Sequence, residues 1–332
     1  TWEPPKPEDA AYVFFTSGST GTPKGALGTH SALAQFTRWH RDVLDLDTTD
    51  RVSLLRSLSF DAIHREVFTP LVTGATIAVA PPNLAPDDVL SWLRGAEVSI
   101  LHVTPSHSAV WLSETAPKTG FKLRTTVFSG ELLTSNHVKQ WRSHLDRPGE
   151  IINMYGPTET TMAITQHRVE DAPEEGPISV GTPRSHAQAL VVDEHDRLCP
   201  PRVQGEVLLR TPYRTRGYIN DPIAQEQAFV PSPFSNDPED IVYRTGDLGW
   251  MDEDGRLMIT GRIDDQVQIL GLRVEPAEVA AHLTAYPGLK AAEVLAFGEP
   301  GEVPSLTAYI VADAGVPEGD LRVHLMERLV RR

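Results

Sequence analysis

The sequence predicts an α/β fold with a largely parallel sheet, followed by a β-rich part and a small α+β part. Apolar strand candidates alternate with helical stretches over the first 180 residues, a pattern typical of βαβ units. Later strand candidates are short and are separated by turns rich in proline and charge. We therefore expect an α/β core (1–180), a β-rich subdomain (181–263) and a C-terminal subdomain (264–332).

The first part of the chain contains most of the expected regular elements. Apolar residues at helical spacing, from Leu33 to Val43, predict a helix over about Ser31–Leu44. A second helix is expected around Phe60–Phe68. The strand candidates are Arg51–Leu58, Thr76–Ala80, Val98–Val103 and Thr125–Phe128 in the core, and Ala189–Asp193 and Gly205–Arg210 in the β-rich part, where Pro231–Asp240 is a predicted loop.

Composition and charge exclude several classes of protein. The 332 residues carry a formal net charge of −15, which argues against nucleic acid or an anionic membrane as the main partner, because both bind basic surfaces. Cys199 is the single cysteine, so we expect no internal disulfide and a reducing compartment, the cytoplasm. We expect no membrane span, because no apolar run approaches the roughly 20 residues needed, and no signal peptide.

An apolar strand runs directly into a loop of glycines and hydroxyls over Tyr12–Gly25. Tyr12–Phe15 fit a buried strand, and the glycines let backbone N–H groups approach an anion closely. A Walker A loop ends in Gly-Lys-Ser/Thr, whereas Pro23 precedes Lys24 and Gly25 follows it, which disfavours a P-loop NTPase. We expect these residues to hold the phosphates of a nucleotide: Thr16, Ser17, Gly18, Ser19, Thr20, Gly21 and Lys24.

This stretch resembles the phosphate-binding motif of the adenylate-forming (ANL) superfamily, which includes acyl-CoA synthetases, luciferases and the adenylation domains of nonribosomal peptide synthetases. Three further motifs narrow the resemblance to the last group: Asn153–Glu159, Tyr243–Leu248 and Gly261–Val267. The resemblance implies a partial ANL-type adenylation fold. The family's N-terminal portion and its C-terminal lysine motif are absent from the 332 residues, so we expect weak ATP binding and slow adenylation by this chain alone.

The Asn153–Glu159 motif implies contacts with adenine and phosphate. Tyr155 would stack on adenine and Asn153 would read its amino edge. Thr158 would hold the α-phosphate, and Glu159 would hold Mg²⁺ through a hard oxygen. Alone, the Gly156-Pro157 pair also fits an ordinary turn. The resemblance adds Gly130 and Gly156 to the residues that contact ATP or AMP.

The two later motifs imply contacts with ribose and a hinge. Asp247 would accept hydrogen bonds from both ribose hydroxyls, although alone it also fits a turn aspartate. Arg262 would contact the nucleotide as a permanent cation, and Asp264 would be the hinge of the C-terminal subdomain. Gly271–Glu275 corresponds to the loop that meets the carrier's pantetheine arm. The implied catalytic residues are Thr158, Glu159, Lys24 and Arg262.

Asp61 indicates the substrate class. In amino-acid-activating members of the family an aspartate at this place pairs with the α-ammonium, whereas relatives that activate aryl acids usually have asparagine; a helix N-cap is the alternative role. Arg65 and His102 suit a substrate side chain with a carboxylate or another acceptor, unless Arg65 pairs with Glu66. The remaining implied pocket residues are Ala62, Val127, Ser129, Met154, Met162 and Ala163.

The sequence therefore predicts an ATP-dependent ligase that activates an amino acid. ATP and Mg²⁺ are the expected cofactors, and the expected products are aminoacyl-AMP and pyrophosphate. The aminoacyl group would pass to the phosphopantetheine thiol of a peptidyl carrier protein, alongside other synthetase domains. Two alternatives stay open: an acyl- or aryl-CoA ligase, and a truncated nucleotide-binding or interaction module without turnover.

Overall fold

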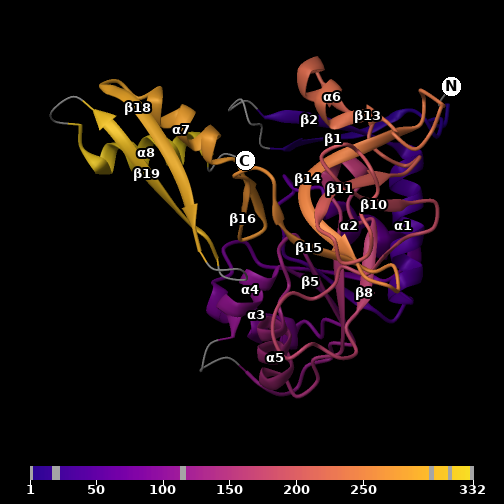
Figure 1. Cartoon of the computed structure of the whole chain (residues 1–332). Helices are drawn as coiled ribbons and strands as arrows, with labels where there is room; N and C mark the ends of the chain where they lie inside the picture. The colour runs from indigo at the N-terminus through magenta and orange to yellow at the C-terminus, as the bar shows by residue number, and fades with distance from the viewer. Residues whose placement is uncertain (1–2, 17–22, 113–116, 299–302, 313–315, 330–332) are drawn as a thin grey trace.

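The computed structural model describes residues 3–16, 23–112, 117–298, 303–312 and 316–329. Figure 1 shows a large body with a smaller C-terminal lobe beside it, and the short strand β16 lies between the two. No helix within these ranges is long and apolar enough to cross a membrane.

The central sheet of the body has seven strands in the order β4-β3-β5-β6-β7-β8-β9. The first five strands in this order are parallel, whereas β8 and β9 pair antiparallel. This confirms the predicted α/β fold with a largely parallel sheet. The strands are β3 (Arg51–Leu54), β4 (Thr76–Val79), β5 (Ile100–Val103), β6 (Thr125–Ser129), β7 (Glu150–Tyr155), β8 (Thr165–Arg168) and β9 (Thr182–Pro183).

Alternate side chains of the central strands enter two separate cores, because successive residues of a strand point to opposite faces. Phe128 packs with Leu101 and with Trp141 of α5 in one core, and Val127 packs with Phe36 of α1 in the other. The predicted first helix is thus confirmed. The helices are α1 (His30–Leu44), α2 (Ile63–Thr73), α3 (Val89–Gly95), α4 (Pro105–Trp111) and α5 (Ser135–His144), with the 3₁₀ turns η1 (Pro86–Asp88) and η2 (Thr158–Thr160).

A three-stranded sheet contains the start of the predicted phosphate loop. It consists of β1 (Ala10–Thr16), β2 (Lys24–Thr29) and β12 (Tyr218–Ile219), with β2 in the middle. The expectation that Tyr12–Phe15 form a buried strand was wrong: the Phe15 side chain is 67% exposed. Because β1 pairs only with β2 among the described strands, it is an edge strand whose alternate residues face outward.

The β-rich part forms an antiparallel sheet, as its short strand candidates predicted. The long strand β14 pairs with β11 and β13 and, after a register shift, with β15. Its elements are β10 (Gln188–Val192), β11 (Gly205–Arg210), α6 (Pro222–Ala228), β13 (Phe229–Pro231), β14 (Ile241–Met251) and β15 (Leu257–Arg262).

The C-terminal lobe has a hydrophobic core of its own, formed around Val279, Leu283, Val294 and Leu321. A two-residue turn at Leu270-Gly271, with positive φ at both residues, closes the hairpin of β16 and β17 that precedes the lobe. The elements are β16 (Val267–Ile269), β17 (Leu272–Val274), α7 (Pro276–Thr284), β18 (Leu289–Phe297), β19 (Ser305–Ala312) and α8 (Glu318–Leu329).

Two buried histidines join α1 to the central sheet. His40 Nε2 lies 3.2 Å from His102 Nε2, and His40 Nδ1 lies 3.1 Å from the Thr69 hydroxyl. Burial lowers the pKa of His40 to about 3. Burial, followed by the charge of Arg65, lowers the pKa of His102 well below its usual value. Both rings are therefore neutral in the folded protein, and unfolding takes up protons below about pH 6.5.

We expect the stability of the protein to fall as the pH drops from 7 to 5, because the unfolded histidines then bind protons that the folded ones do not. His40→Gln should reduce this loss by about 2 kcal/mol, the linkage contribution of a histidine whose pKa moves from 6.5 to 3. Urea unfolding at both pH values measures it, with exposed His195→Gln as the control. An unchanged loss in the His40 variant contradicts the argument.

Candidate functional site

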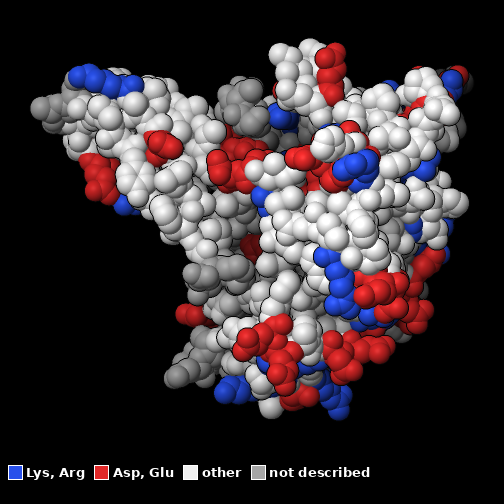
Figure 2. All heavy atoms as spheres, in the orientation of Figure 1, with Lys and Arg blue, Asp and Glu red and all other residues white. Residues whose placement is uncertain are grey.

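A cavity of about 650 Å³ lies where the carboxyl ends of parallel strands face the C-terminal hairpin. Ser129 and Tyr155, the last residues of β6 and β7, line the body side, and Gln268 and Leu272 of the hairpin line the other. Figure 2 shows the surface hollowed between the lobe and the body. This edge of a parallel sheet is where such folds bind ligands.

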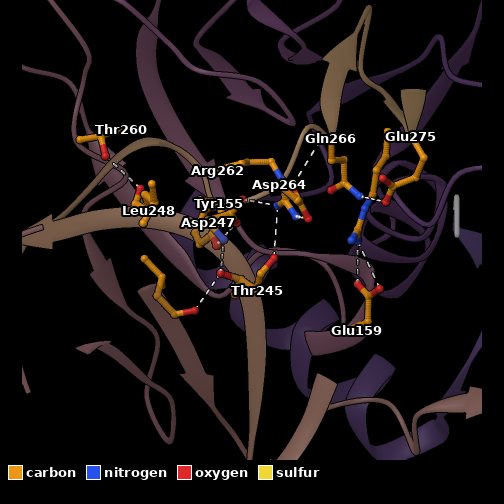
Figure 3. Close-up of polar contacts among 12 residues, drawn as sticks. Tyr155, Glu159, Thr245, Asp247, Leu248, Thr260, Arg262, Asp264, Gln266 and Glu275 are labelled. Atoms are coloured by element: carbon orange, nitrogen blue, oxygen red, sulfur yellow. Dashed lines mark hydrogen bonds and ion pairs between the residues drawn. The ribbon is translucent and has the colours of Figure 1, made fainter. Parts of the chain in front are cut away.

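The residues expected at the nucleotide form a polar network at one side of the cavity (Figure 3). The Tyr155 hydroxyl donates to Asp247 Oδ2 at 2.5 Å, and Arg262 forms an ion pair with the other oxygen of Asp247. Arg262 also donates to both oxygens of Asp264, at 2.6 and 2.8 Å. Burial, followed by the Asp247 charge, raises the pKa of Tyr155 well above its usual value, so the phenol keeps its proton.

Glu159 lies beside this network and has two partners from distant strands. The Tyr218 hydroxyl of β12 donates to Glu159 Oε1 at 2.6 Å, and Arg273 Nη1 of β17 donates to the same oxygen at 3.2 Å. Burial disfavours the charge on Arg273, but Glu159 together with Tyr243 and Tyr218 outweighs it and raises the pKa of Arg273 well above its usual value. Lys24 Nζ lies 5.5 Å from the centre of the Tyr218 ring, which brings two expected catalytic residues into one neighbourhood.

The surroundings of Glu159 do not fit a metal ion in this arrangement. Its fully buried carboxylate is paired with the Arg273 guanidinium, which already supplies the positive charge that a metal ion would supply. Among the described residues no group of three or more histidine, cysteine or acidic side chains could hold a metal. Mg²⁺ at Glu159 therefore stays a prediction of the family resemblance.

Asp61 and Arg65 also line the cavity. Burial raises the pKa of Asp61, although hydrogen bonding to Thr158 and the charge of Arg65 act in the other direction. The N-cap alternative is wrong, since α2 is capped at Ala62 without a side-chain bond. The expected residues that line the cavity are Thr16, Asp61, Ala62, Arg65, Ser129, Gly130, Met154, Tyr155, Gly156, Thr158, Met162, Ala163, Asp247 and Arg262.

Three expected site residues point elsewhere. His102 and Val127 are buried in the protein core and are not part of the cavity wall. Asn153 uses its amide N–H groups to bond the carbonyls of Ile178 and Ser179, at 3.2 and 3.0 Å. These bonds hold the side chain in the sheet, and the reading of adenine by Asn153 stays a prediction. Ser17, Gly18, Ser19, Thr20 and Gly21 lie outside the described residues.

The structure adds Glu131, which the sequence analysis did not single out. Its carboxylate accepts hydrogen bonds from the Ser106 backbone and hydroxyl at 2.9 and 2.7 Å, and from the Gly271 backbone at 2.6 Å. Glu131 thereby fixes the tip of the hairpin against the start of α4. The available signal was its position directly after Ser129 and Gly130 at the end of a buried strand.

Comparison with known sequences identifies a family and several relatives of this chain. The family described as AMP-binding enzyme matches residues 1–219. The chain is 32% identical to tyrocidine synthase 2 of Brevibacillus parabrevis over 97% of its length, and 34% identical to surfactin synthase subunit 2 of Bacillus subtilis over 95%. It spans 9% of the length of each of these relatives.

Solved structures share the fold. The Vibrio cholerae adenylation domain AlmE, in complex with glycyl-adenosine-5′-phosphate, is 27% identical with a TM-score of 0.82, over 95% of this chain and 60% of that one. Holo-PA1221, an NRPS protein containing adenylation and PCP domains, is 26% identical with a TM-score of 0.81, over 95% of this chain and 54% of that one.

Replacing Arg273 by Met should free the β16–β17 hairpin from the body. The amides of 267–274 should exchange hydrogen roughly tenfold faster or more, because hydrogen bonds to charged groups contribute about 1.5–3 kcal/mol. Mass-spectrometric hydrogen exchange measures this, with the amides of β6 as the internal reference. Arg322→Met, which removes an exposed ion pair with Glu318, is the control. Unchanged exchange in the hairpin would mean that Arg273 does not fasten it.

Proposed function

Since the chain belongs to the AMP-binding enzyme family, we propose that it acts as an ATP-dependent ligase that converts an amino acid and ATP to aminoacyl-AMP and pyrophosphate. The aminoacyl group then passes to the phosphopantetheine thiol of a peptidyl carrier protein. The similar structure that contains adenylation and PCP domains supports this partner. We also propose other synthetase domains as partners. We also propose a cytoplasmic location, because Cys199 is the single cysteine.

One observation carries the proposal: the half-buried carboxylate of Asp61 and a set of polar groups suited to a nucleotide line the same cavity. Asp61 is half-buried and has no cation within ion-pair distance among the described residues, although the charge of Arg65 acts on it. A substrate α-ammonium can pair with it directly, because a partly desolvated carboxylate gains from a counter-charge in contact. The reacting carboxylate of the same amino acid then lies toward Thr158, which hydrogen-bonds Asp61.

The proposed nucleotide site uses groups already on the cavity wall. Asp247 accepts bonds from the ribose hydroxyls in place of Tyr155 and Arg262, and Tyr155 packs against adenine. Thr16, whose buried hydroxyl has no hydrogen-bond partner in the described residues, faces the phosphates with Lys24. Only glycine fits at position 156, because an added Cβ would lie 2.2 Å from the Met162 carbonyl oxygen. These features fit a nucleotide.

The proposed reaction has two steps. A substrate carboxylate oxygen bonds to the α-phosphorus of ATP, and the bond from that phosphorus to pyrophosphate breaks. The carrier's thiol then loses its proton and bonds to the acyl carbon, and AMP leaves. No covalent enzyme intermediate is needed, so Thr158, Lys24 and Arg262 act by positioning and charge stabilisation. We propose Mg²⁺ as the counter-ion of ATP and assign no step to it.

We propose three units with boundaries at 1–180, 181–263 and 264–332. The separate hydrophobic core of the C-terminal lobe supports the second boundary. The pairing of β9 with β8 carries 182–183 into the central sheet, which blurs the first boundary. Asp264 lies at the second boundary and accepts two bonds from Arg262, so a rotation about this residue exchanges these bonds for others.

Amino-acid-dependent ATP–pyrophosphate exchange by the full-length natural protein tests the proposed function. We expect exchange with amino acids and not with acids that lack an amino group, because the Asp61 carboxylate selects for an ammonium group. Aryl and fatty acids form the second arm of the panel. Exchange only with these acids assigns the protein to the CoA-ligase class. ATP binding without any exchange assigns it to the modules without turnover.

Asp247→Asn should weaken ATP binding by roughly 10- to 100-fold, because a charged acceptor of the ribose hydroxyls becomes a neutral one. Isothermal titration calorimetry with ATP measures the change in Kd. Asp193→Asn removes an exposed aspartate that is paired with Arg197 and is not part of the cavity wall, and serves as the matched control. Equal Kd values for the Asp247 variant and the wild type reject the ribose role.

A further inference from the structure

Arg65 is a buried cation on the wall of the cavity. Its side chain comes from the first turn of α2, four positions after Asp61, and the residue is 4% exposed. Burial lowers the pKa of Arg65 to about 10, which leaves the guanidinium charged at neutral pH. A buried charge without a partner is unfavourable, so a cation in this place implies a counter-charge.

The described part of the chain supplies no such counter-charge within ion-pair distance. Glu66, the alternative partner in the sequence, instead pairs with Arg56 at 3.4 Å and accepts a bond from the Leu55 backbone. Asp61 forms no ion pair with Arg65 within the described ranges, and Arg65 Nε has no hydrogen-bond partner there. Within the described residues, the Arg65 guanidinium therefore lines the cavity with its Nε unpartnered and without a carboxylate at ion-pair distance.

The charges of Glu66 and Asp61 act on Arg65 from beyond ion-pair distance, and burial together with the charge of Arg56 opposes them. The nearby His40 and His102 are neutral and bond to one another at 3.2 Å, so they offer no negative charge. Met162 and Ala163 make the neighbouring wall apolar. In such surroundings an ion pair is stronger than in water, and a planar guanidinium can bind a carboxylate through two parallel hydrogen bonds.

We propose that the substrate is an amino acid whose side chain carries a carboxylate or a similar anionic group, and that Arg65 binds this group. This inference rests on the proposed function, because it assigns the α-ammonium to Asp61. The two opposite charges on one wall match a substrate that carries an ammonium and a second carboxylate. The α-carboxylate stays free to react with ATP.

Neutral amino acids fit this wall poorly. Leucine would leave the guanidinium buried without a partner, and sites built to bind a polar group reject analogues that lack it by as much as about 10⁴–10⁵-fold. Asparagine and glutamine offer a carbonyl oxygen but no charge, and charge-assisted hydrogen bonds are about twice as strong as neutral ones. Arg65 therefore acts as a specificity determinant for an acidic side chain.

ATP–pyrophosphate exchange by the full-length natural protein tests the inference with aspartate, glutamate, asparagine, glutamine, leucine and phenylalanine. We expect kcat/KM for aspartate or glutamate to exceed that for leucine by about 100-fold or more. It should exceed the value for the matching amide by about tenfold. Arg65→Met should remove this preference and leave the Kd for ATP unchanged.

Two further variants control for the loss of a buried arginine. Arg184 is equally buried, at 4% exposed, but packs on Phe36 and Trp39 away from the cavity wall. Arg184→Met should therefore keep the preference for acidic amino acids. Arg65→Lys keeps a charge and should retain the preference with a lower kcat/KM, which preserves the test if Arg65→Met fails to fold.

The outcomes separate the two proposals. Preferred exchange with leucine, phenylalanine or an amide overturns the acidic substrate and leaves amino acid adenylation standing. A preference for aspartate or glutamate that survives in Arg65→Met overturns the role of Arg65. Absence of exchange with every amino acid, while ATP binds, overturns the proposed function and the inference with it.

Discussion

The buried carboxylate of Glu159 connects three parts of the molecule. It follows β7 of the central sheet, and its side chain bonds Tyr218 of the N-terminal sheet and Arg273 of the C-terminal hairpin. Its backbone carbonyl also accepts two bonds from Thr215. Because a buried carboxylate is costly without partners, these parts must meet correctly to satisfy it. The wall that the hairpin contributes to the cavity thus depends on this charge, together with the Glu131 carboxylate at the hairpin tip.

The parallel sheet accounts for what the sequence could predict. Apolar runs that alternate with helical stretches indicated the order of strands, and parallel strands bring their carboxyl ends to one edge. Ser129 and Tyr155 line the cavity because they end neighbouring strands β6 and β7. The cavity residues Asp61 and Asp247 came from motifs of a known family rather than from periodicity.

The sequence could not predict features that depend on side-chain direction or on distant contacts. His102 and Asn153 lie on strands, where successive side chains point to opposite faces, so a shift of one position exchanges the cavity for the core. The Gly271–Glu131 and Arg273–Glu159 bonds join residues 140 and 114 positions apart, so no local pattern indicates them. Phe15 has the composition of a buried strand, and only the pairing order shows that its strand lies at an edge.

The hairpin turn at Leu270-Gly271 gives the cavity a wall that is not part of the rigid sheet. A small molecule that touches Gln268 and Leu272 as well as Tyr155 gains those contacts only while the hairpin is docked. Such a molecule binds one arrangement of the protein better than any other and shifts the population toward it. An inhibitor designed on this surface would therefore act by trapping a conformation, in addition to competing for the site.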